Sequence, residues 1–180
     1  MSQLEKSLME IFGEVIPKEN ERESLIRFLE LIRSADKEVR VVAGELRPSF
    51  YNAELAETIR QKIKEKPNFK FYFLYSKDKD IETAIEMTKK DNEALAVVFS
   101  DFSENVIVYC ATRRPTYHFS TIDNWIFMEE KHEQGAERKV FIQKNEKLAK
   151  EYDDIFENMI APLDSPIAIR VQPIKFKIAA

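Results

Sequence analysis

The sequence predicts an α/β protein with a mixed, mostly parallel sheet flanked by helices. Short β-branched or aromatic runs alternate with segments of helical periodicity between residues 27 and 99, as in a sheet built from right-handed crossovers. Beyond residue 104, strand-like runs follow one another with brief connections, which predicts an antiparallel part. With 180 residues, 44% hydrophobic and 33% charged, the chain is expected to form one globular domain over 1–180.

Residues 1–35 are expected to form two helices that precede the sheet. Apolar residues recur at helical spacing from Leu4 to Val15, and Pro17 interrupts this pattern. A second periodic set runs from Leu25 to Ile32. The second helix is therefore expected to begin near Asn20.

Three strands and two helices are predicted next. The run 39–43 is short, β-branched and followed by Gly44, which is typical of a strand buried on both faces. A helix from Leu55 ends before Pro67, and an aromatic-rich strand follows at 69–75. After a short helix that contains Ile81, Ala84 and Ile85, we interpret the apolar run from Ala94 to Phe99 as the third strand.

The antiparallel part is predicted to hold strands at 105–111, 116–122 and 125–130. Asp123-Asn124 separates the last two strands, and both residue types tolerate positive φ, so we expect a tight hairpin there. A last helix spans 145–160. Its apolar face is assigned to core packing and consists of Leu148, Tyr152, Ile155, Phe156 and Met159. The C-terminal extension, 161–180, alternates as a strand that closes the sheet or reaches into a partner subunit.

Composition and charge argue against several classes of protein. The net charge of −4 disfavours strong non-specific binding to nucleic acid. The two histidines have no Cys/His cluster beside them, so neither a metal ion nor a cofactor is expected. The apolar runs are far shorter than the roughly 20 residues of a membrane span, and the N-terminus lacks the pattern of a secretory signal. We therefore expect a cytoplasmic protein, with Cys110 as a small buried hydrophobe.

The segment from Leu29 to Gly44, with its continuation through Pro48, Leu55 and Ile59, resembles one half of the phospholipase D superfamily. The resemblance rests on the pattern and order of the elements. It implies a single half-domain of that family with extra N-terminal helices. Because members of the family build their site from two halves, it also implies a homodimer with the hairpins facing across a two-fold axis.

The family signature is His-x-Lys, four residues, then Asp, and two registers fit this chain. With Asp123 as the aspartate, Thr116 takes the position of the nucleophile and His118 that of the lysine. With His118 as the nucleophile, Ser120 replaces the lysine and Trp125 the aspartate. We prefer the first register because it keeps the aspartate at a turn after an apolar strand.

The signature is incomplete in both registers. Neither supplies both a nucleophilic imidazole and an ammonium group. Glu129 and Glu130 stand where the family has a Gly-Ser pair, and two carboxylates would repel an anionic phosphodiester. The resemblance therefore implies a domain that has lost its catalytic set and binds rather than reacts.

Positive charge for a bound phosphate is expected from arginines, since no metal site is visible in the sequence. Arg113 and Arg114 precede the hairpin, where a guanidinium can fork onto a phosphate beside His118, and a solvated loop pair is the alternative. Arg47 follows the first strand, at the carboxyl end where open sheets bind ligands. His118 is the candidate for catalysis, with a structural, hydrogen-bonded histidine as the alternative. The candidate ligand-binding residues are Arg47, Arg113, Arg114, Thr116, Ser120 and Asp123.

Three functions remain open at this point. The preferred one is a catalytically degenerate phospholipase D-like domain, a homodimeric binding or regulatory protein for a phosphate-bearing ligand such as a nucleotide or a nucleic acid. The second is a metal-independent phosphodiesterase or nuclease that uses His118. The third is a pure dimerisation or interaction domain.

Overall fold

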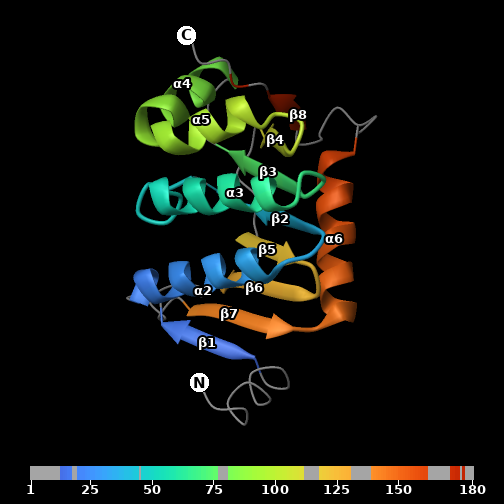
Figure 1. The fold of residues 1–180 in the computed structure, drawn as a ribbon. Helices are drawn as coiled ribbons and strands as arrows, with labels where there is room; N and C mark the ends of the chain where they lie inside the picture. The colour runs from blue at the N-terminus through green and yellow to red at the C-terminus, as the bar shows by residue number, and fades with distance from the viewer. Residues whose placement is uncertain are drawn as a thin grey trace, which may run out of the picture.

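The computed structural model describes residues 13–17, 20–44, 46–76, 81–111, 118–130, 139–161, 171–174 and 176. The strands are β1 (Glu14–Pro17), β2 (Glu38–Val42), β3 (Lys70–Ser76), β4 (Val106–Ala111), β5 (His118–Ile122), β6 (Trp125–Glu130), β7 (Lys139–Lys144) and β8 (Val171–Ile174). The helices are α2 (Glu21–Ser34), α3 (Ala53–Glu65), α4 (Ile81–Asp91), α5 (Glu93–Asp101) and α6 (Glu146–Ile160), labelled as in Figure 1.

The eight strands form one mixed sheet in the order β1-β7-β6-β5-β2-β3-β4-β8. Strands β2, β3 and β4 are parallel to one another, and every other neighbouring pair is antiparallel. The predicted α/β fold with a mixed sheet flanked by helices is confirmed. Parallel pairing is limited to three central strands, which is less than the sequence pattern predicted.

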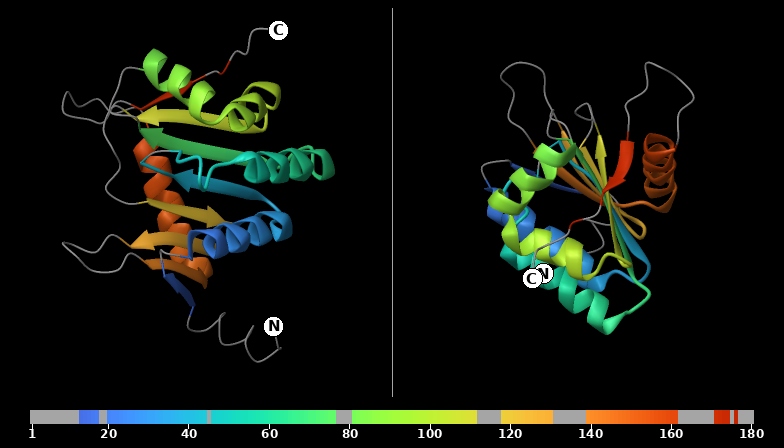
Figure 2. Two further views of the ribbon diagram at one scale, coloured as in Figure 1. Left: turned by 90° about the vertical axis from the view of Figure 1, so that its left-hand side faces the viewer. Right: turned by 90° about the horizontal axis from the view of Figure 1, so that it is seen from above.

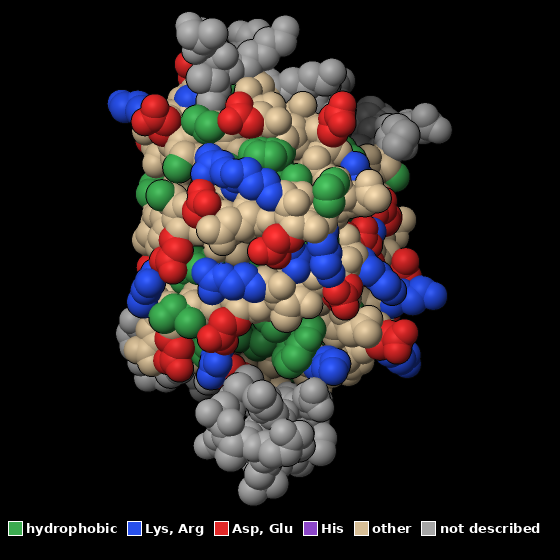
Figure 3. Space-filling view, in the orientation of Figure 1, with side chains coloured by type: hydrophobic (Ala, Val, Ile, Leu, Met, Phe, Trp, Pro, Cys, Tyr) green, Lys and Arg blue, Asp and Glu red, His purple; other side chains and the backbone are tan. Residues whose placement is uncertain are grey.

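Helices cover both faces of the sheet. Figure 2 shows α2, α3, α4 and α5 on one face and α6 on the other. The alternation of side chains along each strand divides them between two cores, because Val39 and Val41 of β2 face the four-helix layer and Val42 faces α6. On the surface seen in Figure 3, acidic and basic side chains are interspersed.

Two sequence-based assignments between residues 94 and 111 are wrong. The run from Ala94 to Phe99 lies in the helix α5 and not in a strand. Leu95, Ala96, Val98 and Phe99 are all buried, and a buried helix this short has no polar face to reveal its period. The third parallel strand is instead β4, which was assigned to the antiparallel part.

The two outer strands of the sheet were not fully predicted. Val15 lies in the short strand β1, which pairs with the unpredicted strand β7, and not in a helix. The part of the predicted first helix before residue 13 lies outside the described residues. At the other edge β8 pairs with β4, so the C-terminal extension closes the sheet of its own chain. The expectation of a buried Cys110 is confirmed.

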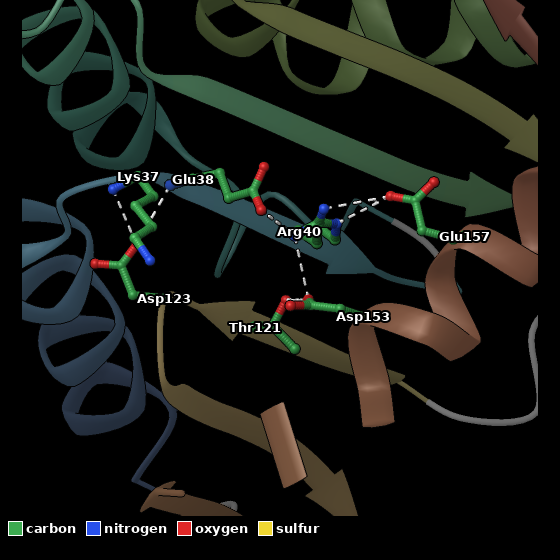
Figure 4. Close-up of polar contacts among 7 residues, drawn as sticks. All are labelled: Lys37, Glu38, Arg40, Thr121, Asp123, Asp153 and Glu157. Carbon is green, nitrogen blue, oxygen red and sulfur yellow. Dashed lines mark hydrogen bonds and ion pairs between the residues drawn. The ribbon is translucent and has the colours of Figure 1, made fainter. Parts of the chain in front are cut away.

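Helix α6 is held on the sheet by an apolar stripe and by one arginine. Phe156 is fully buried, whereas Ile155, which was assigned to the core, is 40% exposed. Figure 4 shows the guanidinium of Arg40 in β2 reaching Asp153 at 3.2 Å and Glu157 at 3.3 Å, both on α6. Burial raises the pKa of Asp153, although the Thr121 hydroxyl and Arg40 act in the opposite direction. The ion pairs of Arg40 and the hydrogen bond between Thr121 and Asp153 thus hold α6 against β2 and β5.

The predicted hairpin between β5 and β6 is present and is tied to the start of β2. Asp123 has a φ of 49°, as expected for a residue type that tolerates this region. Its Oδ2 accepts a hydrogen bond from the backbone N–H of Asp36 at 2.6 Å, and its Oδ1 accepts from those of Lys37 at 2.9 Å and Glu38 at 3.3 Å. These bonds place Ile122 opposite Val39, and this fixes the register of β5 along β2.

Replacing Asp123 by glycine should lower the free energy of unfolding by about 2 kcal/mol, because three backbone donors lose a charged acceptor. Glycine adopts positive φ without strain, so the change removes the carboxylate without distorting the hairpin. Urea unfolding measures the difference, with the exposed neighbour Asn124→Ala as the control. A loss for Asp123→Gly no greater than that of the control would show that the carboxylate does not hold the hairpin.

Candidate functional site

The carboxyl ends of the parallel strands β2, β3 and β4 lie at the end of the sheet where β5 begins. We call this end of the sheet the carboxyl edge. Phe119, the second residue of β5, pairs with Val42, the last residue of β2. His118 therefore lies at the carboxyl end of β2, where the strand direction reverses between β2 and β5. Figure 2 shows the arrowheads of β2, β3 and β4 pointing to this edge. Open α/β sheets bind ligands outside the carboxyl ends of their parallel strands.

His118 belongs to the face of the sheet that the four-helix layer covers. Its neighbour Phe119 packs against Tyr152 of α6, so alternation directs His118 and Ser120 to the opposite side. The side chain of His118 is half-buried, and its Nε2 atom is shielded from solvent. The residue opposite His118 in the ladder is Glu129.

The turn that connects β2 to α3 is firmly anchored at this edge. The carbonyl oxygen of Arg47 accepts hydrogen bonds from the backbone N–H groups of Phe50 at 3.1 Å and Tyr51 at 2.7 Å. The side-chain amide of Asn92, between α4 and α5, donates to the carbonyl oxygen of Leu46. Because backbone hydrogen bonds and the side chain of Asn92 both hold the turn, its side chains are positioned without a ligand.

Aromatic packing carries this turn over β5 and β6. The ring of Phe50 lies 5.4 Å from that of Phe28 in α2 and 5.9 Å from that of Phe127 in β6. Phe127 pairs with Ser120 across the β5–β6 ladder. The turn thus covers the same face of the sheet that carries His118, and Ser120 beside it is only 5% exposed.

Arg47 differs from the other described arginines. Its side chain is half-buried, and within the described residues it has no ion pair or side-chain hydrogen bond. The other arginines of the described part each have a partner in the chain, and they are Arg22, Arg27, Arg33, Arg40 and Arg60. A partly desolvated guanidinium without a carboxylate is the group that an external anion would satisfy.

The candidate residues predicted from the sequence fall in different places. Arg113, Arg114 and Thr116 lie outside the described residues. His118 and the turn of Arg47 share the carboxyl edge. Asp123 lies at the other end of β5, roughly 16 Å from His118 at the usual rise per strand residue, and its carboxylate is already occupied by backbone donors.

Phe50 and Tyr51 were not among the predicted site residues. The sequence signal for them was the aromatic pair that follows Pro48 and Ser49, between a strand and a helix. In the described ranges no cluster of three or more His, Cys, Asp or Glu side chains is suited to a metal ion. None of the described helices has the length and apolar character to cross a membrane.

No protein-family model and no curated protein sequence matches this chain. Many solved structures are similar in fold, and three of them share 12–14% sequence identity with this chain. NucT from Helicobacter pylori superposes with a TM-score of 0.51 at 12% identity, over 81% of this chain and 93% of NucT. Phosphatidylserine synthase from Haemophilus influenzae superposes with a TM-score of 0.64 at 14% identity, over 93% of this chain and 40% of the synthase.

The third structure is TrmBL2, an archaeal chromatin protein, with a TM-score of 0.57 at 13% identity, over 87% of this chain and 58% of TrmBL2. The chain thus spans about half the length of TrmBL2 and less than half of the synthase. At these identities the likeness concerns the fold. NucT and the synthase are phospholipase D-like proteins, so this chain has the fold of a phospholipase D-like half-domain.

Proposed function

We propose that this protein is a catalytically degenerate phospholipase D-like domain that binds a phosphate-bearing ligand at the carboxyl edge of β2. The observation that carries the proposal is the guanidinium of Arg47, which is half-buried on an anchored turn and has no partner within the described residues. A guanidinium forks onto two oxygens of one phosphate, and a preorganised turn loses little entropy when it binds.

The other proposed ligand groups belong to the same edge. His118 begins β5 there, and its ring nitrogen other than the shielded Nε2 would donate a hydrogen bond to a phosphate oxygen when it carries a proton. Arg113 and Arg114 belong to the segment 112–117 that connects β4 to β5, and we propose that they add positive charge. Ser120 is too deeply buried to reach a ligand, so it is left out of the proposed site.

The loss of catalysis is proposed from residue types. The turn position of Asp123 supports the register in which Asp123 is the signature aspartate. Thr116 then stands for the nucleophilic histidine and His118 for the lysine. A threonine hydroxyl needs a base to become a nucleophile. In addition, the residue paired with His118 in the β5–β6 ladder is the acidic Glu129, and a carboxylate repels an anionic phosphodiester.

We also propose a homodimer. A phospholipase D site is composed of two halves, and this chain has one. NucT matches over nearly its whole length and is thus a one-half chain of similar size. Two-fold pairing would bring two copies of the carboxyl edge together.

A second candidate function is a dimerisation platform without a ligand. It is favoured by the match to TrmBL2, an archaeal chromatin protein of which this chain spans only 58%, because a fold of this kind then forms only one part of a larger protein. In this role the half-domain would join two copies of the protein. The two candidates differ in whether the carboxyl edge takes up an anion.

Substituting Arg47 by methionine should weaken the binding of ribose 5-phosphate by about tenfold or more, because one charge-assisted contact to phosphate is lost. Isothermal titration calorimetry measures the dissociation constant. The matched control is Arg60→Met, which removes an arginine that is already paired with Glu57 on α3. No saturable binding to the unchanged protein would reject the ligand site and favour the dimerisation platform.

The purified protein should not hydrolyse bis(p-nitrophenyl) phosphate or single-stranded DNA in the presence of EDTA. The reason is that neither register of the signature supplies a complete nucleophile and ammonium pair. Release of p-nitrophenol and gel analysis of the DNA measure turnover. Hydrolysis that disappears in His118→Ala would overturn the degenerate site and establish the phosphodiesterase.

Light scattering on the purified protein should give twice the mass of one chain. The expectation follows from the incomplete half-site, which needs a second copy. A monomer at concentrations where ribose 5-phosphate still binds would separate the ligand site from the proposed dimer.

A further inference from the structure

We infer that the ligand of the carboxyl edge is a nucleoside phosphate whose base stacks on Tyr51 and Phe50 while its phosphate binds Arg47. The inference rests on the proposed function, since it names the chemical class that the same site would take. It adds a base-recognition surface that the phospholipase D-like signature does not include.

The first support is the composition of one short turn. Arg47, Phe50 and Tyr51 lie within five residues and are all half-buried, so each keeps part of its surface exposed. The rings of Phe50 and Tyr51 meet edge to face, with centroids 5.2 Å apart. A guanidinium beside two partly exposed aromatic rings suits a nucleotide, because the guanidinium can bind the phosphate while the planar base stacks on the rings.

The second support is the rigidity of these rings. Phe50 is backed by Phe28 and Phe127, both of which are almost fully buried. The backbone N–H groups of Phe50 and Tyr51 are bonded to the carbonyl oxygen of Arg47. The rings are therefore positioned before a ligand arrives, which limits the entropy that binding costs.

The charge around the turn favours a small nucleotide over a polynucleotide. Binding along a nucleic-acid backbone neutralises several phosphates, each with its own cation. Here the net charge is −4, and the hydroxyl of Ser49, two residues after Arg47, donates to the carboxylate of Glu21 at 2.9 Å. These charges favour a ligand with one or two phosphate groups over a polynucleotide.

The test compares adenosine 5′-monophosphate with ribose 5-phosphate by calorimetry on the unchanged protein. These ligands share the sugar phosphate and differ in the base. Adenosine monophosphate should bind roughly 5- to 100-fold more tightly, the ratio that corresponds to one stacked base. Because no substitution is involved, this comparison does not depend on the folding of a variant.

Tyr51→Leu should remove most of that ratio, whereas Tyr51→Phe should keep it. The matched control is Tyr109→Leu, which removes a half-buried tyrosine that packs on Phe156 at the α6 face. Its ratio should equal that of the unchanged protein. Circular dichroism melting confirms that each variant is folded.

The outcomes separate the inference from the proposed function. Equal affinities for the two ligands would overturn base recognition and retain the phosphate site. Absence of binding by either ligand would remove the phosphate site and the inference with it. A single-stranded oligonucleotide that binds more tightly than adenosine monophosphate would overturn the small-nucleotide assignment.

Discussion

The geometry of this protein depends on the hydrogen bonds that Asp123 accepts from three consecutive backbone N–H groups at the start of β2. They join a tight hairpin to the turn between α2 and β2, and so they fix the antiparallel strand β5 against a parallel strand. A slip of one residue would move every side chain of β5 to the other face. The position of His118 at the carboxyl edge follows from this register, although Asp123 itself lies at the far end.

Arg40 in β2 and Arg47 on the turn after β2 show how the same residue type has different roles. Arg40 is surrounded by carboxylates of β2 and α6, so its charge is used to hold a helix on the sheet. Arg47 lies only seven residues later, is also partly removed from water, and has no such partner among the described residues. A half-buried guanidinium without a partner contributes little to the stability of the fold. This contrast is what directs the proposal to an anion at the carboxyl edge.

Much of the fold could be predicted because local chemistry and global fold agree. The β-branched run of β2 and the Asp123-Asn124 hairpin carry strong local signals, and both are present. The segment Ala94–Phe99 failed because its partly exposed positions, Ala94 and Val97, are also apolar, so no polar face separates a helix from a strand. At the site, the sequence placed Arg47 after a strand, but the lack of a partner for its guanidinium is a property of three-dimensional neighbours. The roles proposed for Phe50 and Tyr51 could not be predicted for the same reason, since their partial exposure depends on how the turn packs on Phe28 and Phe127.

The claim that the carboxyl edge of β2 is the binding end of the molecule is tested most directly by nuclear magnetic resonance. Backbone amide shifts of the labelled protein would be followed while adenosine 5′-monophosphate is added. The account predicts saturable shifts in residues 46–52 and at His118, with the amides around Asp123 at the opposite end unchanged. Shifts that cluster at the Asp123 end or on α6, with none in residues 46–52, would contradict it.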